Sequence, residues 1–372
     1  MPIERLGADD RIMLGVSRRW PQDIGALLML EGSGGFRIER ARAAIASKLH
    51  LAPPLRQRIM QPLRGRGGPL WVDDAGFDVA DHVHELRLEA PVGEPELLAF
   101  VERLRHERLD LGRAPWAITF LTGLPDGRAA AFVKVHHSLA DGLATMTLIG
   151  ALLDREAGAA WQPAPAWVPR RPPVQSELVA DNLRRRIAEI GSVMRAVVHP
   201  VRMLRRVARS LPAIWELLAE RPATPTSVDR VIGLDRNLAL ARASYGTLRR
   251  VARRADATVN DVLLTVIAGG LRALLLSRGE AVEGVTLRAY VPVTLRTSWR
   301  GPQHGTQVSQ MAVPLELADP DPVRRLRRIA DQTERRKAKP RPDVGKLFRG
   351  RVMPALLLAA IIRQRVNITT AS

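Results

Sequence analysis

The chain contains no cysteine, few aromatic residues and very little lysine. Of its 372 residues only 4% are aromatic, and five lysines leave 57 − 5 = 52 arginines among the basic residues. The absence of cysteine excludes a disulfide framework, a thiolate nucleophile and any metal or iron–sulfur site ligated by cysteine. Whole classes of redox and thiol chemistry are therefore excluded.

Long apolar runs are also missing. The most apolar stretch, from Pro354 to Ile362, is far shorter than the roughly 20 residues that span a bilayer. The first seven residues show no basic segment followed by an apolar one, as a secretory signal would. We therefore expect no membrane-spanning segment, no secretory signal and a cytoplasmic location.

What the sequence has in excess is positive charge. The formal net charge is +19, with 46% hydrophobic residues, a composition too apolar for a disordered chain. Such a balance indicates an anionic partner, and a nucleic acid, a phospholipid surface and a phosphorylated co-substrate all fit. No nucleic-acid-binding module is evident, so a nucleic-acid partner is not expected.

The pattern of the chain predicts two domains with a linker between them. Residues 1–160 and 231–372 both mix helical and strand-like segments, whereas residues 161–230 hold a proline-rich stretch followed by basic amphipathic helices. Strands are expected at Ile24 to Leu30, Ala117 to Leu121, Ala129 to His137, Val285 to Val293 and Gln307 to Leu317. Helices are expected at Ile38 to Leu49, Glu94 to Glu107, Asn260 to Ser277 and Pro322 to Arg336.

The helix that follows the linker is amphipathic and rich in arginine. Apolar residues recur every three or four positions from Val179 to Val197, and Arg184, Arg185 and Arg186 lie mostly beside that stripe. Such a helix can lie on an anionic membrane or lipid droplet. A solvated face covering a core explains the pattern equally well, and both interpretations stay open.

One short motif contains the candidate catalytic residues. His136 and His137 end a predicted strand, and Asp141 and Gly142 follow before a predicted helix from Leu143 to Leu153. Neighbouring strand residues point to opposite faces, so only one imidazole can serve a given cavity, and a shared metal ion is disfavoured. A neutral imidazole at a strand end can accept a proton from a hydroxyl group.

Two further groups of residues are better explained by packing. His82, His84 and Glu85 resemble a metal site, but no third ligand is evident, so surface or core positions are expected. The tryptophans at positions 71, 116, 161 and 167 are expected to anchor the core. No GxSxG nucleophile elbow and no phosphate-binding glycine loop occurs.

The motif resembles the HHxxxDG signature of the coenzyme A-dependent acyltransferase superfamily, which includes chloramphenicol acetyltransferase and peptide synthetase condensation domains. Further segments are similar to the bacterial wax ester synthase/diacylglycerol acyltransferase family. They are Pro69-Leu70-Trp71, Leu109-Asp110-Leu111-Gly112-Arg113-Ala114-Pro115-Trp116, Thr258-Val259-Asn260-Asp261-Val262, Val291-Pro292-Val293-Thr294-Leu295-Arg296 and Gly305-Thr306-Gln307-Val308-Ser309.

This resemblance implies an α/β (α+β) architecture. Two chloramphenicol acetyltransferase-like domains are expected, each a mixed sheet flanked by helices, with the active site at their interface. Residues 365–372 look like the opening of a strand, at a point where family members usually continue. We therefore expect the second domain to be incomplete at its C-terminal end.

The resemblance also assigns roles to residues. His137 becomes the general base and His136 its neighbour in the motif, while Gly142 leaves room beside the base. Asp141 becomes the partner of an arginine, for which Arg296 is a candidate. Asn260 and Asp261 are placed near the active centre as substrate-binding residues. No metal and no cofactor are implied, because acyl-CoA enters as a co-substrate.

The predicted function is esterification of diacylglycerol, or of long-chain alcohols, by acyl-CoA, with triacylglycerol the favoured product. Two alternatives remain. One is an acyltransferase of the same superfamily with another acceptor or a carrier-protein donor. The other is a shortened, non-catalytic relative that binds lipid surfaces through the basic helices.

Overall fold

The structure is a computed structural model of the whole chain, and it divides into two compact units. The residues it describes are 3–17, 21, 23–31, 35–89, 92–140, 142–154, 163–198, 224–230, 233, 237–294, 308–338 and 368–369. Unit 1 comprises residues 1–193, 234–239 and 296–307, and unit 2 comprises residues 194–233, 240–295 and 308–372. Each unit is described by itself below.

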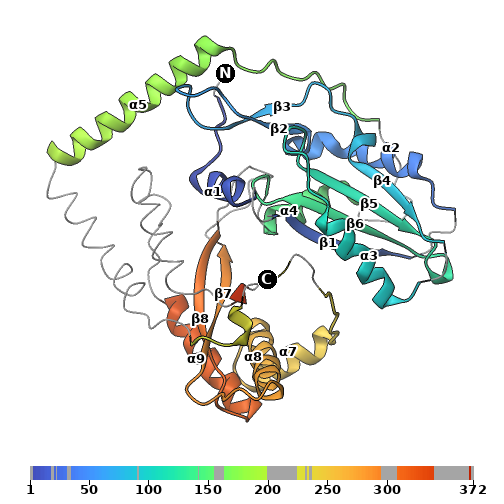
Figure 1. Cartoon of the computed structure of the whole chain (residues 1–372), viewed down its shortest axis with the longest axis vertical. Coiled ribbons are helices and arrows are strands. Elements are labelled where there is room, and N and C mark those ends of the chain that lie inside the picture. The colour runs from blue at the N-terminus through green and yellow to red at the C-terminus, as the bar shows by residue number, and fades with distance from the viewer. Residues whose placement is uncertain are drawn as a thin grey trace. The chain divides into compact units, whose positions relative to one another are not determined.

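Unit 1 is built on a mixed four-stranded sheet with the order β1-β6-β5-β4 (Figure 1). Its strands are β1 (Asp23–Leu30), β4 (Val83–Arg87), β5 (Trp116–Thr122) and β6 (Ala129–His136). β6 pairs antiparallel with both β1 and β5, whereas β4 runs parallel to β5. The strand that carries the first motif histidine is therefore central, and all eight of its residues are buried.

Helices cover both faces of this sheet because β6 alternates its side chains between two cores. Ala131, Val133 and Val135 point into the larger core, which includes residues of α2 (Ile38–Lys48) and α4 (Gly142–Leu152). Ala130 and Phe132 point into the other, with α3 (Glu94–His106). A period of two thus places successive residues of one strand in different layers.

The N-terminal segment and a long helix border a two-stranded sheet of unit 1. This sheet pairs β2 (Gln57–Met60) with β3 (Leu70–Asp73), and α1 (Ala8–Ser17) follows an isolated bridge between Arg5 and Leu70. α5 (Gln175–Val198) contributes Leu178, which is buried with Leu70 and Val72. The Arg5 guanidinium donates a 2.7 Å hydrogen bond to Asp181, which ties α5 to the N-terminal segment.

Unit 2 holds a second sheet with the order β8-β7-β9. β7 (Thr286–Thr294) pairs antiparallel with β8 (Val308–Glu316) and parallel with β9 (Ile368–Thr369). Its helices are α7 (Tyr245–Arg254), α8 (Val259–Ser277) and α9 (Pro322–Ala338). Leu264, Ala268 and Leu275 of α8 pack with apolar residues of β7 and β8, so this sheet also has a helix-covered face.

Short 3-10 helices connect these elements, at Leu49–Leu51, Pro53–Arg56, Val79–Asp81, Pro125–Gly127 and Ser227–Asp229.

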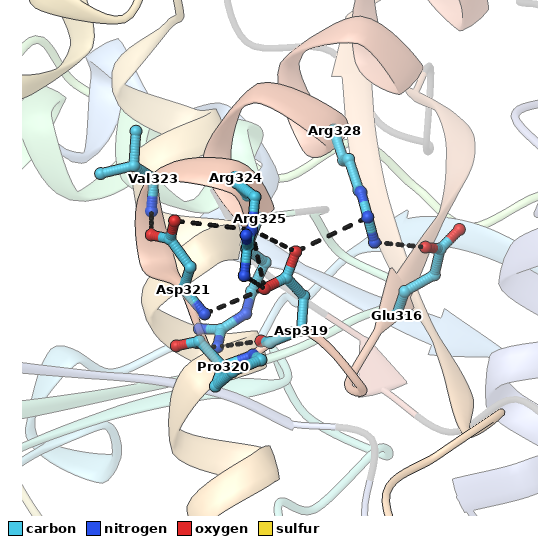
Figure 2. A network of polar contacts seen from close by, with 8 residues as sticks. All are labelled: Glu316, Asp319, Pro320, Asp321, Val323, Arg324, Arg325 and Arg328. Carbon is cyan, nitrogen blue, oxygen red and sulfur yellow. Dashed lines mark hydrogen bonds and ion pairs between the residues drawn. The ribbon is translucent and has the colours of Figure 1, made fainter.

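A cluster of charges fixes the start of α9 (Figure 2). Asp319 accepts hydrogen bonds from Arg324 at 3.1 Å to 3.3 Å, and Arg328 lies between Asp319 and Glu316. Arg325 is buried and its Nη2 donates to the carbonyl of Asp319 at 2.8 Å. A Cβ on Gly269 of α8 would lie 2.7 Å from Nη1 of Arg325, so the glycine leaves room for this guanidinium.

The expectation of no membrane-spanning segment, which was based on apolar runs, did not take account of α8. Within the described ranges it is the one helix long and apolar enough to cross a membrane, by length and composition only. Its sequence is not an uninterrupted apolar run, because Asn260, Asp261 and Arg272 lie within it. Its inward face lies in the core of unit 2, and core helices satisfy the same criterion.

The α/β class and the mixed sheets with flanking helices are confirmed. The nine predicted segments that carry sheets or flanking helices agree with the observed elements to within about two residues. α1, β2, β3, β4 and α7 were not predicted.

The domain limits at 160 and 231 stay predictions, although α5 packs within unit 1. The apolar stretch from residue 354 to 362, Trp161 and the predicted extension of the basic segment beyond residue 198 lie outside the described residues.

Candidate active site

The motif histidines lie where a buried strand turns into a helix. β6 ends at His136, whose backbone N–H donates to the carbonyl of Pro115 at 2.9 Å. The N–H of Leu139 donates back to the carbonyl of His136 at 2.9 Å, which closes the turn, and α4 then begins at Gly142. The predicted succession of strand, tight turn and helix is therefore confirmed.

His136 is a buried residue whose two ring nitrogens both have partners. Its Nε2 lies 2.5 Å from Oγ of Ser17 and its Nδ1 lies 2.7 Å from Oγ of Ser138. Burial, and next the neighbouring charge of His137, lower the pKa of His136 to about 4. This ring is therefore neutral near neutral pH and is held in place on both sides.

His137 follows the strand and has a different environment. Whereas His136 is buried, His137 belongs to the turn and is half-buried as a residue. Its Nδ1 is itself buried and has no hydrogen-bond partner among the residues that the structure describes. The two imidazoles therefore differ: both ring nitrogens of His136 have partners, and Nδ1 of His137 has none among the described residues.

The remaining motif residues are only partly described. Gly142 is the first residue of α4, one residue before the predicted start of the helix at Leu143. Asp141 and its candidate partner Arg296 lie outside the described residues. The predicted ion pair between them therefore stays a prediction.

Asn260 and Asp261 belong to the first turn of α8, in unit 2. Asp261 is buried, and its Oδ2 accepts hydrogen bonds from the backbone N–H and the hydroxyl of Thr258 at 2.8 Å and 2.7 Å. Its Oδ1 accepts one from Thr333 of α9 at 2.7 Å. Asn260 is half-buried, and its amide makes no hydrogen bond within the described part of the chain. Their predicted role in substrate binding stays a prediction.

A cavity of about 180 Å³ lies in unit 1 near the histidine strand, and the motif did not predict it. Lys134, two residues before His136 on β6, lines it together with Phe132, Thr119 and Arg108, whereas His136 and His137 do not. Lys134 is buried and its Nζ donates to the carbonyls of Leu104 and Glu107 at 2.8 Å and 2.5 Å. It thereby satisfies carbonyls at the end of α3.

Burial also shifts the pKa values of two charged groups beside this strand. It lowers the pKa of Lys134, against the opposing effect of Asp23 and Glu107. It raises the pKa of Asp23, which lies opposite His136 in the sheet register, although Lys134, Arg105 and Arg108 oppose this. An alternating strand predicts that Lys134 and His136 share a face, but not that both are buried.

His82 lies in the core, one of the two positions expected for it. Its ring stacks between Phe77 and Trp116, at centroid distances of 5.1 Å and 4.8 Å, and its Nδ1 lies 2.9 Å from the carbonyl of Trp116. Burial lowers its pKa. His84 is exposed, and the described residues contain no cluster of three or more side chains that could hold a metal ion.

The packing role expected for the tryptophans is confirmed where they are described. Trp116 is buried and its Nε1 donates to the carbonyl of Leu55 at 2.7 Å. Trp71 is buried, and Trp167 lies edge-on to Phe77 beneath the guanidinium of Arg56.

The fold is of the chloramphenicol acetyltransferase-like class. The structure is similar to the wax ester synthase/diacylglycerol acyltransferase from Marinobacter aquaeolei VT8, with a TM-score of 0.60 and 20% identity over 97% of this chain and 76% of that one. It is also similar to the first condensation domain of the calcium-dependent antibiotic synthetase, with a TM-score of 0.56, 18% identity and coverage of 90% and 74%. At these identities the likeness shows the fold.

The sequence itself gives the family. Residues 6–263 match the wax ester synthase/diacylglycerol acyltransferase catalytic domain, and the chain belongs to that family. A Mycobacterium bovis protein named as a diacylglycerol O-acyltransferase is 30% identical over 345 residues, which cover 88% of this chain and 67% of the relative. A Mycobacterium tuberculosis protein, named as a probable diacylglycerol O-acyltransferase, is 28% identical over 87% and 68%.

Proposed function

We propose that this chain transfers a fatty acyl group from acyl-CoA to the hydroxyl group of diacylglycerol, with His137 as the general base. Membership of the acyltransferase family and the names of the mycobacterial relatives support the reaction class and the acceptor. The observation that carries the assignment of the base is that His137 is a half-buried residue whose Nδ1 no described residue binds.

In this reaction His137 accepts the hydroxyl proton while the alcohol oxygen attacks the thioester carbonyl. The new C–O bond gives a tetrahedral oxyanion, whose collapse breaks the C–S bond and releases the CoA thiolate, which takes up the proton. Direct transfer of this kind needs no acyl-enzyme. A general base contributes about 10² to 10⁴-fold to the rate, so positioning and oxyanion stabilisation supply the rest.

The test compares His137→Ala with His84→Ala. His84 is exposed on β4, so its loss removes an imidazole without disturbing the motif. With oleoyl-CoA and diolein, wild type and His84→Ala should release CoA thiol and form triolein, and His137→Ala should be about 10² to 10⁴-fold slower. Equal rates for both variants would remove His137 as the base.

The acceptor and donor are tested in the same assay. Hexadecanol in place of diolein measures wax ester formation, and an acylated carrier protein in place of oleoyl-CoA tests the other donor. Transfer from the carrier protein alone would favour the alternative acyltransferase. A folded wild-type chain that releases no thiol with any pair of substrates would favour the non-catalytic alternative.

We also propose that α5 contacts an anionic membrane or lipid droplet. Val179, Leu183, Ile187 and Ile190 are 49%, 56%, 60% and 62% exposed, although all four are large and apolar. Successive helical residues turn by about 100°, so these four share an arc of roughly 80°. By the same geometry the exposed Arg184 and Arg186 flank this arc on its two sides.

The opposite side of α5 is already occupied. Leu178 is buried against β3, and Asp181 and Asn182 bind Arg5 and the carbonyl of Gly65. A helix fixed on one side, with an apolar stripe between arginines on the other, suits an interfacial position. Leu183→Ser with Ile187→Ser should reduce sedimentation with phosphatidylglycerol vesicles, while Val168→Ser, another exposed apolar position, should not. Localisation in the cytoplasm stays a prediction.

A further inference from the structure

Ser17 connects the first helix of the chain to the histidine turn. It is the last residue of α1, and its Oγ lies 2.5 Å from Nε2 of His136, 119 residues further along the chain. We propose that Ser17 is a positioning residue, which holds the ring of His136 and through it the orientation of His137. The inference rests on the proposed role of His137 as the base.

The hydrogen bonds of His136 determine its tautomer. The backbone N–H of Ser138 lies 3.2 Å from Nδ1 and can only donate, so Nδ1 is the acceptor. The ring is neutral near neutral pH because burial lowers its pKa to about 4. The hydrogen therefore lies on Nε2, which donates to Oγ of Ser17.

Two hydrogen bonds join His136, on one side of His137, to Ser138 and Leu139 on the other. The ring of His136 binds the N–H of Ser138, and the carbonyl of His136 binds the N–H of Leu139, so both hydrogen bonds span residue 137. A rotation of the His136 ring would break the bond to the N–H of Ser138, which directly follows His137, and leave only the backbone bond from Leu139 to hold the turn. Ser17 opposes this rotation because it holds the other ring nitrogen.

α1 is itself packed within unit 1, so the residue that contacts His136 belongs to an anchored helix. The residues before it pair with the β3 region, where the N–H of Leu6 donates to the carbonyl of Pro69 at 2.9 Å. Leu14 is buried in the larger core of the unit. The helix thus provides a rigid support for the hydroxyl at its last residue.

The experiment compares Ser17→Ala, Ser17→Thr and Ser47→Ala in the full chain. Ser47 is a matched control, because it is a buried serine of unit 1 whose Oγ binds only the nearby carbonyl of Ala44 among described residues, at 2.7 Å. Nitrogen-15 spectra of histidine-labelled protein give the tautomer and environment of each ring. Initial rates with oleoyl-CoA and diolein give kcat and KM.

We expect wild-type His136 to carry its hydrogen on Nε2. Ser17→Ala should shift the ring signals of both His136 and His137 and lower kcat about tenfold, the equivalent of one ordinary hydrogen bond, with KM unchanged. Ser17→Thr should restore both, and Ser47→Ala should change neither.

Ring signals of His137 that are identical in wild type and Ser17→Ala would overturn the inference, whatever the activity. So would equal kcat values for Ser17→Ala and Ser47→Ala. Failure of the proposed function has another signature: His137→Ala would retain full activity, while the nitrogen-15 spectra would still report whether Ser17 orients the ring.

Discussion

The hydroxyl of Thr333 donates a 2.7 Å hydrogen bond to Oδ1 of Asp261, and so joins the middle of α9 to the first turn of α8. The other carboxylate oxygen, Oδ2, closes a capping box with Thr258. All these groups lie within unit 2. Asp261 therefore has a structural role in addition to the one that the family pattern assigns to it.

Removal of Asp261 should destabilise unit 2. Asp261→Ala removes the acidic half of the capping box and the side-chain acceptor of the buried Thr333 hydroxyl, which keeps the carbonyl of Ala330 at 3.0 Å. We expect a loss of about 1 to 3 kcal/mol in the free energy of unfolding. Asn260→Ala, one residue earlier, should cost about 0.5 kcal/mol or less. Urea titrations followed by circular dichroism measure both. Similar unfolding midpoints would contradict the structural role of Asp261, and a loss of activity confined to Asn260→Ala would support its place in the substrate site.

Two neighbouring glycines of α8 should respond differently to a methyl group. A Cβ on Gly269 would lie 2.7 Å from Nη1 of the buried Arg325, whereas one on Gly270 would meet no atom within 4 Å. Gly270→Ala should stabilise the helix by about 0.5 to 1 kcal/mol. Gly269→Ala should lack this gain and lose about 1 to 3 kcal/mol, since the arginine has to move. Thermal unfolding of the two variants measures the difference, and equal melting temperatures would contradict it.

The loop between β5 and β6 contains a similar pair. Gly123 has φ +87°, and a Cβ there would lie 2.5 Å from the carbonyl oxygen of Leu88, while Gly127, with φ +65°, has open space. Gly127→Ala carries only the cost of its backbone conformation, about 1 kcal/mol. Gly123→Ala adds a backbone clash and should cost at least about 2 kcal/mol more. Unfolding by urea tests the order, and a larger loss in Gly127→Ala would refute it.

The stability of unit 1 should depend on pH through His136. Burial lowers its folded pKa to about 4, so between that value and its unfolded pKa near 6.5 the unfolded state binds more protons. Stability is therefore greatest above about pH 6.5 and is lost as the pH falls toward 4. From about pH 7 to about pH 5, wild type should lose on the order of 2 kcal/mol more than His136→Gln, which lacks this group.

Urea titrations at the two pH values measure this difference. An NMR titration of the His136 ring in the wild-type chain gives the pKa directly and does not depend on the variant being folded. A midpoint near 6.5 would contradict the prediction.

The sequence by itself determined the framework of the protein. Apolar runs such as residues 129–136, and the three-to-four periodicity of α5, indicated principal strands and helices, because these patterns follow from local backbone geometry. The HHxxxDG spacing located the histidine turn and, by resemblance, the family, which the match over residues 6–263 shows. The strands β2, β3 and β4 were missed because segments of four or five residues are too short to show a clear pattern.

Only the tertiary structure decided how the two histidines differ. The sequence shows two adjacent imidazoles, and strand alternation separates them, but nothing local predicts that Ser17 of α1 binds His136. The same holds for Asp261, whose partner Thr333 lies 72 residues away, and for Lys134, which two carbonyls near the end of α3 bind. Burial and hydrogen-bond partners arise when distant elements pack, and they determine which polar groups remain available for chemistry.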